Sequence, residues 1–168
     1  VIAGLMSLHT VGAAPADSYG PVEPESGPWR RQVWRIPSSL PQAAVRAVVL
    51  RPPGPGPFPL MVMNHGSTQS AERRMAMGLP DYGALARFFI RRGYAVALPQ
   101  RPGHGATGGR YLEDQNGCDD ADFLTAGHGA ADSIAVAITY LTAQPFVRRT
   151  DVIVVGQSAG AWGALALA

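Results

Sequence analysis

Residues 151–168 read DVIVVGQSAGAWGALALA: an apolar run, a glycine-flanked serine and a second apolar run. The first run, 151–155, has the continuous apolar pattern of a strand buried on both faces, and the residues from 159 onward favour a helix. Between them, residues 156–160 (GQSAG) match the pattern Gly-x-Ser-x-Gly. In a sharp strand-to-helix turn of this kind, the serine stands at the tip in a strained backbone conformation. The stretch therefore predicts a nucleophilic serine, Ser158.

The two glycines of this turn have a steric reason, since a Cβ at Gly156 or Gly160 would crowd the turn and the packing of the following helix. The N-terminus of that helix would also stabilise negative charge near Ser158. The alternative is an ordinary glycine-rich connection or a phosphate-binding loop. No lysine follows the glycines, which excludes a Walker-type loop, and the dinucleotide-binding pattern Gly-x-Gly-x-x-Gly is absent here.

Upstream of this stretch, hydrophobic patterning predicts strands and helices in the order β, β, β, α, β, α, β, α. The expected strands cover 29–36, 43–51, 60–63, 94–99 and 151–155, the first two pairing as an antiparallel hairpin. The expected helices cover 80–92, 130–143 and 159 onward, and a long glycine-rich loop covers 100–117. This alternation predicts an α/β fold: a mostly parallel sheet with helices on both faces and an antiparallel N-terminal hairpin.

Composition narrows the class of protein. The chain has 168 residues, 14 arginines, no lysine and 12 acidic residues, so the formal net charge is only +2. That balance argues against a nucleic-acid partner, which requires a dense basic surface. With 46% hydrophobic and 15% charged residues the chain is not disordered, and no apolar run reaches the ~18–20 residues of a membrane span.

The two ends of the chain suggest a piece of a longer, exported protein. Residues 1–16 carry no Asp, Glu, Lys or Arg and end in small residues at the A-x-A spacing of a signal-peptide cleavage site, with a buried strand or helix as the alternative. Cleavage there would leave Asp17 first, followed by a flexible leader over 17–28 and a domain over 29–168. Ala168 lies inside an apolar, helix-forming run, so we expect C-terminal truncation. The expected location is periplasmic or secreted.

Three short segments together resemble a known superfamily. They are NHGS at 64–67, RPGHG at 101–105 and GQSAG at 156–160, each directly after an expected strand. In their order and spacing, residues 30–168 are similar to the N-terminal part of an α/β-hydrolase, most similar to the dienelactone hydrolase-like and related secreted esterase and peptidase branches. The three segments are specific to the superfamily and not to a substrate.

The resemblance implies roles for individual residues. The oxyanion hole would consist of the backbone N–H groups of Ser67 and Ala159, Gly66 would let the loop approach the substrate, and His65 would support the loop without acting as base. Because the triad order in this superfamily is Ser, then Asp or Glu, then His, the acid and base would lie beyond Ala168. Classical dienelactone hydrolases use a cysteine nucleophile, so a serine favours a generic ester or peptide substrate.

Other candidate residues leave alternatives open. His104 would tie neighbouring loops together as in related folds, or lie in a surface turn, and His128 is expected to be exposed. Cys118 is either a disulfide partner for a later cysteine or a lone thiol. The acidic residues between 113 and 122 miss the spacing of an EF-hand loop and are expected to be a solvated loop.

Two functional hypotheses follow. The first is a serine hydrolase that cleaves an ester, or less favourably a peptide, of a small-molecule substrate through an acyl-enzyme on Ser158, without a cofactor or metal. The second is a non-catalytic binding protein that keeps the same fold. The sequence gives no indication of the oligomeric state.

Overall fold

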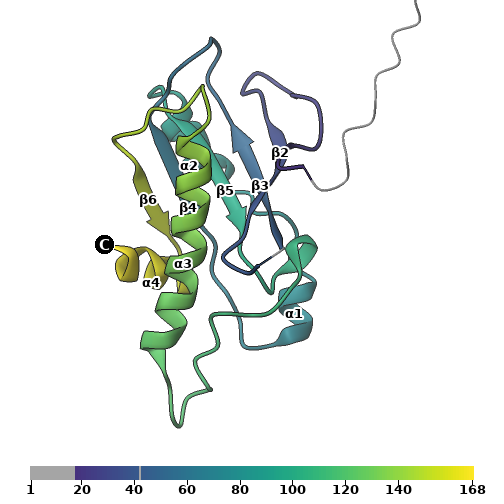
Figure 1. Cartoon of the computed structure of the whole chain (residues 1–168), viewed down its shortest axis with the longest axis vertical. Coiled ribbons are helices and arrows are strands. Elements are labelled where there is room, and N and C mark those ends of the chain that lie inside the picture. The colour runs from purple at the N-terminus through teal and green to yellow at the C-terminus, as the bar shows by residue number, and fades with distance from the viewer. Residues whose placement is uncertain (1–17, 42) are drawn as a thin grey trace, which may run out of the picture.

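A single mixed sheet organises the molecule. The computed structural model describes residues 18–41 and 43–168, so the expected signal-peptide tail at 1–16 lies outside the described residues. Within them, six strands lie in the order β1-β2-β3-β5-β4-β6 (Figure 1). The strands are β1 (Gly20–Pro21), β2 (Gln32–Pro37), β3 (Ala44–Leu50), β4 (Leu60–Asn64), β5 (Ala95–Gln100) and β6 (Ile153–Gly156). The pairings of β1–β2, β2–β3 and β3–β5 are antiparallel, and those of β4–β5 and β4–β6 are parallel.

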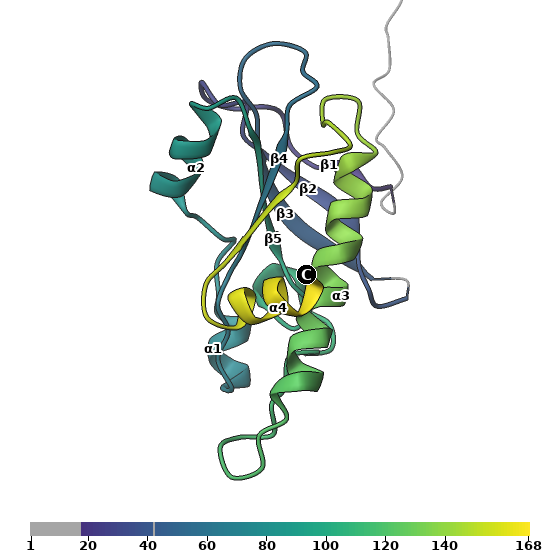
Figure 2. The same ribbon diagram turned by 90° about the vertical axis from the view of Figure 1, so that its left-hand side faces the viewer.

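Helices cover both faces of this sheet, as expected. They are α1 (Ala71–Met75), α2 (Gly83–Ile90), the short 3-10 helix η1 (Gly105–Thr107), α3 (Phe123–Thr142) and α4 (Ala159–Leu167). Figure 2 shows α2 on one side of the sheet and α3 with α4 on the other. None of the described helices is long and apolar enough to cross a bilayer.

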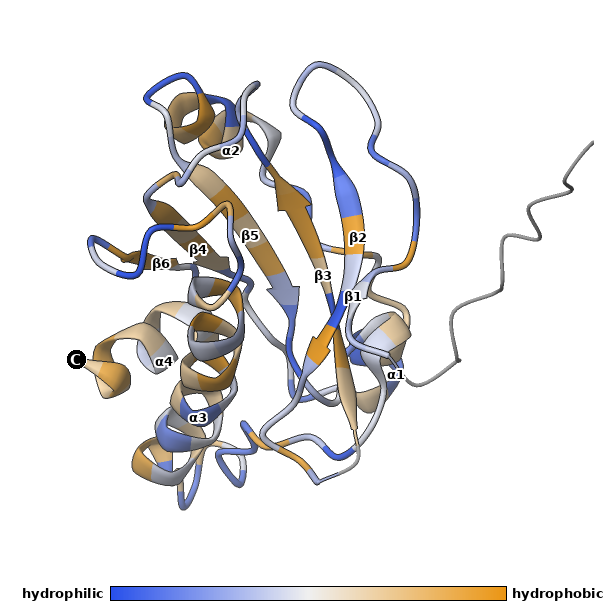
Figure 3. Ribbon diagram, turned by 45° about the horizontal axis from the view of Figure 1, so that its top comes forward, coloured by the Kyte–Doolittle hydropathy of each residue, from blue (hydrophilic) through white to orange (hydrophobic). Residues whose placement is uncertain are grey.

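The strand pattern explains the two cores. On β4, Leu60 and Val62 face the cluster that includes Ala137 and Leu141 of α3, whereas Met61 and Met63 face the cluster under α2. All five residues of β4 are buried, and all six of β5. Hydrophobic colouring accordingly concentrates on these central strands (Figure 3). The continuous apolar runs in the sequence thus belong to strands covered on both faces, as predicted.

The N-terminal hairpin is confirmed, because β2 and β3 pair antiparallel from Gln32↔Val49 to Pro37↔Ala44. The segment expected as an exposed leader is largely exposed, but Gly20–Pro21 pairs with β2. The Glu23 carboxylate also accepts a hydrogen bond from the Val33 N–H (2.9 Å). The described part of the leader is therefore attached to the sheet.

Two helix boundaries differ from the sequence-based expectation. The helix expected at 130–143 begins at Phe123, since the Asp122 side chain accepts a hydrogen bond from the Thr125 N–H (2.9 Å). Gly127 and Gly129, which precede the expected helix, lie inside the observed one. The helix expected from residue 80 begins three residues later, at Gly83. Short α1 and β1 were not predicted at all.

Candidate active site

The turn between β6 and α4 has the geometry that the sequence predicted. Ser158 is the N-cap of α4 with φ 51° and ψ −122°, a region that residues other than glycine rarely occupy. Its carbonyl accepts from the N–H groups of Ala161 (2.9 Å) and Trp162 (3.0 Å), so the helix begins directly after it. The side chain of Ser158 is exposed at the tip of this turn. Strain of this kind persists only where the surroundings enforce it.

Glycine is required on both sides of the turn. A Cβ on Gly156 would collide with the backbone of Gly160 and Ala161, and one on Gly160 would lie 2.5 Å from the carbonyl oxygen of His65. Because the obstacles are backbone atoms, no side chain can move aside. The predicted steric reason for both glycines is thus confirmed.

A second turn, residues 64–67, lies beside Ser158. It follows β4, and the Gln157 N–H donates to the Asn64 carbonyl (3.0 Å). An ideal Cβ on Gly66 would lie 3.4 Å from Cβ and 4.0 Å from Oγ of Ser158. The turn therefore lies beside the serine, and a methyl group at position 66 would already be in van der Waals contact with it.

His65 is buried beneath this turn and uses both ring nitrogens. Nδ1 donates to the Gly66 carbonyl (2.7 Å), and Nε2 accepts from the Arg101 backbone N–H (3.0 Å). Burial, together with the charge of Arg101, lowers the pKa of His65 to about 3. A neutral imidazole with both nitrogens occupied supports the loop and has no free lone pair for a proton from Ser158.

His104 is fully buried, so the alternative of a surface turn is wrong. Its Nδ1 lies 3.1 Å from the carbonyl oxygens of Arg101 and Pro102, which makes Nε2 the acceptor for Ser67 Oγ at 2.8 Å. Ser67 Oγ in turn lies 2.9 Å from the hydroxyl of Tyr111. The imidazole ties three loop segments together, and burial lowers its pKa.

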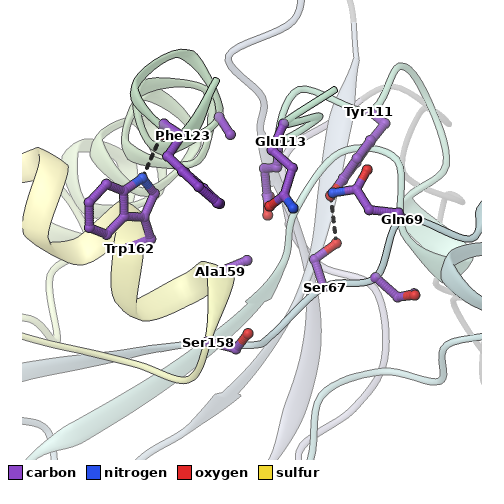
Figure 4. A pocket seen from close by; sticks show the side chains of 11 residues that line it. Ser67, Gln69, Tyr111, Glu113, Phe123, Ser158, Ala159 and Trp162 are labelled. Atoms are coloured by element: carbon purple, nitrogen blue, oxygen red, sulfur yellow. Dashed lines mark hydrogen bonds between the residues drawn. The ribbon is translucent and has the colours of Figure 1, made fainter. Parts of the chain in front are cut away.

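A cavity of about 520 Å³ opens in front of Ser158. Ser67 and Ala159, whose backbone amides were the expected oxyanion donors, line the same cavity as Ser158. In Figure 4, Phe123 and Trp162 lie on one side of the cavity, and Ser67, Gln69 and Tyr111 lie on the other. The remaining lining residues are Thr68, Gln69, Tyr111, Glu113, Gln115, Phe123, Ala126 and Trp162.

The arrangement of strands, elbow and helices recurs in known structures. No protein-family model and no curated protein sequence matches the chain. Acetyl xylan esterase 1 from a Thermoanaerobacterium species superimposes with a TM-score of 0.58 at 16% identity over 92% of this chain. A Bacteroides fragilis protein proposed to be an acetyl xylan esterase gives 0.63 at 20% identity over 91%. Porphyromonas gingivalis dipeptidyl peptidase 4 gives 0.61 at 17% over 83%.

The chain has the α/β-hydrolase fold. It spans 49% and 45% of the two esterase-like structures and 18% of the peptidase. At such identities the likeness concerns the fold alone.

Within this α/β-hydrolase fold, the structure brings together Ser158, Ser67 and Ala159 at one cavity, with His65 underneath. His128 is exposed on α3, as expected, and Cys118 is a free, exposed thiol. No group of three or more His, Cys, Asp or Glu side chains within the described ranges is arranged to hold a metal ion.

Sequence reasoning missed the buried pair Arg101 and Glu113. The expectation of a solvated loop is wrong for Glu113. Its side chain is only 2% exposed and forms a bidentate ion pair with Arg101. The carboxylate accepts from Nε (2.5 Å) and Nη2 (2.9 Å) of the guanidinium. The RPGHG segment drew attention to residues 101–105, but nothing local to Glu113 identifies its partner.

Tyr111, Phe123 and Trp162 were likewise not predicted to meet at one site. Trp162 Nε1 donates to the Phe123 carbonyl (2.5 Å), which joins the start of α3 to α4 beside the cavity (Figure 4). Burial raises the pKa of the Tyr111 hydroxyl, so it stays protonated and available as a donor to Ser67.

Proposed function

We propose that this chain belongs to a serine hydrolase that cleaves an ester, or less favourably a peptide bond, through an acyl-enzyme on Ser158. The observation that carries the proposal is the strained serine at the helix N-terminus, directly beside the 64–67 turn and open to the cavity. The aromatic rings of Phe123 and Trp162, opposite the polar side chains of Ser67 and Gln69, suit a small organic ester. Solved structures with this fold that are named esterases and a peptidase support the same class of reaction.

In the proposed reaction, Ser158 Oγ attacks the substrate carbonyl carbon while its proton passes to a general base. The N–H groups of Ser67 and Ala159 bind the resulting oxyanion. Collapse breaks the bond to the alcohol or amine, which leaves with that proton, and water then attacks the acyl-enzyme to release the acid and restore the serine.

The base and its acidic partner are proposed to follow residue 168. No hydrogen bond joins Ser158 Oγ to a histidine among the described residues, and His65 and His104 both have their ring nitrogens engaged elsewhere. The order Ser, acid, His is the usual order of this fold. The dienelactone hydrolase-like branch stays a proposal from the sequence resemblance.

The test is active-site labelling of the full-length gene product with a fluorophosphonate. We expect stoichiometric labelling that Ser158→Ala abolishes, while Ser39→Ala keeps it, because the Ser39 hydroxyl is hydrogen-bonded to Ser133 and does not line the cavity. Labelling that persists in Ser158→Ala would contradict the assignment of Ser158, and no labelling of the wild type would favour the non-catalytic binding protein.

Export is proposed from residues 1–16 alone. If they are the end of a signal peptide, N-terminal sequencing of secreted material should give Asp17 as the first residue. Material that begins well upstream of Ala14 would refute cleavage there.

A further inference from the structure

We infer that the buried Arg101–Glu113 ion pair positions the oxyanion-binding turn, so that both are positioning residues for the reaction. The inference rests on the proposed function, because it assigns the pair to the turn that would bind the oxyanion. Among the described residues no hydrogen bond or ion pair joins the pair to Ser158, and Glu113 lies outside the three segments that carry the resemblance.

The guanidinium reaches the turn directly. Arg101 Nη2 donates both to Glu113 Oε2 (2.9 Å) and to the backbone carbonyl of His65 (2.7 Å). Arg101 and Glu113 are 1% and 2% exposed, so solvent does not compete for these hydrogen bonds. A charge-assisted bond inside a protein is shorter and stronger than a neutral one in water.

Peptide planarity carries this contact to the peptide that precedes the one with the proposed donor, the Ser67 N–H. The His65 carbonyl and the Gly66 N–H belong to one plane, and the Gly66 carbonyl and the Ser67 N–H to the next. The Arg101 side chain fixes the first plane through the His65 carbonyl. The Arg101 backbone N–H holds the His65 ring, whose Nδ1 fixes the second plane through the Gly66 carbonyl. One residue thus restrains both planes.

The start of α4 lies close to the same carbonyl. An ideal Cβ on Gly160 would lie 2.5 Å from the His65 oxygen, so α4 approaches the turn as closely as glycine permits. The His65 carbonyl therefore accepts from the guanidinium of Arg101 and also lies close to the helix that follows Ser158. This fixes the turn relative to the nucleophile.

Stability alone does not account for the pair. Replacing a buried ion pair by apolar side chains is often neutral or stabilising, because desolvation of the charges offsets their attraction. In addition, Arg101 Nη1 is buried without a hydrogen-bond partner among the described residues, which costs stability. What the pair adds is orientation of the turn through the bond from Arg101 to the His65 carbonyl, and Glu113 also lines the cavity.

The decisive variant replaces both partners together. In the full-length product, Arg101→Met with Glu113→Leu removes the guanidinium without leaving an unpaired buried charge. We expect the protein to fold and KM to change little, while kcat and the rate of phosphonylation at Ser158 fall about 10- to 100-fold, less than the ~10²–10³ measured when an oxyanion donor is lost. Affinity for a trifluoromethyl ketone, which forms a tetrahedral oxyanion, should fall by the same factor.

The matched control is Arg51→Met, which removes an arginine paired with Glu25. Arg51 follows β3, whose end pairs with the start of β5, whereas Arg101 follows the other end of β5. We expect Arg51→Met to lower the melting temperature without changing kcat. A fall in kcat that tracks the melting temperature in both variants would show a merely structural role.

A crystal structure of the double variant separates this inference from the proposed function. We expect the His65–Gly66 peptide to rotate or to occupy two orientations. An unmoved peptide, or an unchanged kcat in the folded double variant, overturns the inference. If the wild type does not react at Ser158, the proposed function fails, and the position of the peptide still decides whether the ion pair holds the turn.

Discussion

Beside Ser158, His65 gives the clearest case of a side chain whose surroundings set its chemistry. Desolvation, followed by the charge of Arg101, lowers its pKa to about 3, while the hydrogen bond to the Gly66 carbonyl acts in the opposite direction. The nearby imidazole of His104 contributes a further small lowering. The folded protein thus holds His65 neutral over the range in which an unfolded chain protonates it.

This difference predicts a loss of stability in acid. Because the pKa of His65 is about 3 when folded and 6.5 ordinarily, the unfolded state binds the extra proton between these values. The free energy of unfolding therefore falls as pH drops below about 6.5, on the order of 2 kcal/mol between pH 7 and pH 5 from this residue. Urea unfolding at pH 7 and at pH 5 measures this difference in the free energy of unfolding.

The control is His65→Asn, which can still donate to the Gly66 carbonyl but does not titrate. The variant keeps His104 and every carboxylate, so their contributions cancel in the comparison. We expect the wild type to lose more stability than His65→Asn over the same interval. Equal losses would contradict the buried, neutral imidazole.

Among the secondary-structure elements, α3 and α4 pack through small residues. An ideal Cβ on Gly163 of α4 would lie 2.5 Å from Cβ of Ala130 on α3, and one on Gly127 would lie 2.6 Å from Nε1 of Trp162. Close contact with α4 explains Gly127 in the interior of α3, whereas a Cβ on Gly129 would collide with the backbone of Leu112. Because glycine is normally unfavourable inside a helix, glycines at 127 and 129 favour a helix that begins only at residue 130.

The contact predicts that Gly163→Ala is destabilising although alanine favours helix. The gain in propensity is about 1 kcal/mol, whereas overpacking costs about 1–3 kcal/mol, so we expect a net loss of up to about 2 kcal/mol. Chemical denaturation measures it. Adding Ala130→Gly removes the colliding methyl group, and the double variant should lose less than the sum of the two single variants. Strict additivity would show that the helices already tolerate the methyl group.

For the molecule as a whole, β6 is an edge strand in the described sheet and pairs only with β4. Its four residues are half-buried, unlike the fully buried β4 and β5. On the neighbouring α4, Trp162 is 46% and Leu165 71% exposed. Unpaired strand edges and exposed apolar side chains favour association with other chains.

We therefore predict that residues 1–168 expressed alone are inactive and poorly stable. A serine at its normal pKa is a weak nucleophile without its base, and loss of triad members leaves only ~10³–10⁴-fold catalysis over water. Turnover of a p-nitrophenyl ester should match that of the Ser158→Ala variant, and the chain should aggregate or bind a hydrophobic dye. Robust Ser158-dependent turnover would place the base among His65, His104 and His128 and refute the proposed order.

The strand–turn–helix around Ser158 could be predicted from the sequence because its determinants are local. An apolar run, two glycines and a helix-forming segment occupy consecutive residues, and the steric need for Gly156 and Gly160 follows from the sharpness of the turn. The central strands were equally clear, since burial on both faces leaves a continuous apolar run. The order of these elements was enough to predict the fold class.

The contents of the site depended on the tertiary structure. Three contacts in the site join separate segments whose spacing carries no periodic signal. They are the Arg101–Glu113 ion pair, the hydrogen bond between Ser67 and Tyr111, which are 44 residues apart, and the hydrogen bond from Trp162 to Phe123. Glu113 looks like any acidic loop residue until the fold buries it against Arg101. Hydrophobic periodicity reports which face of an element is covered, but only the packed chain determines which polar side chains meet, because those contacts form between residues distant in sequence.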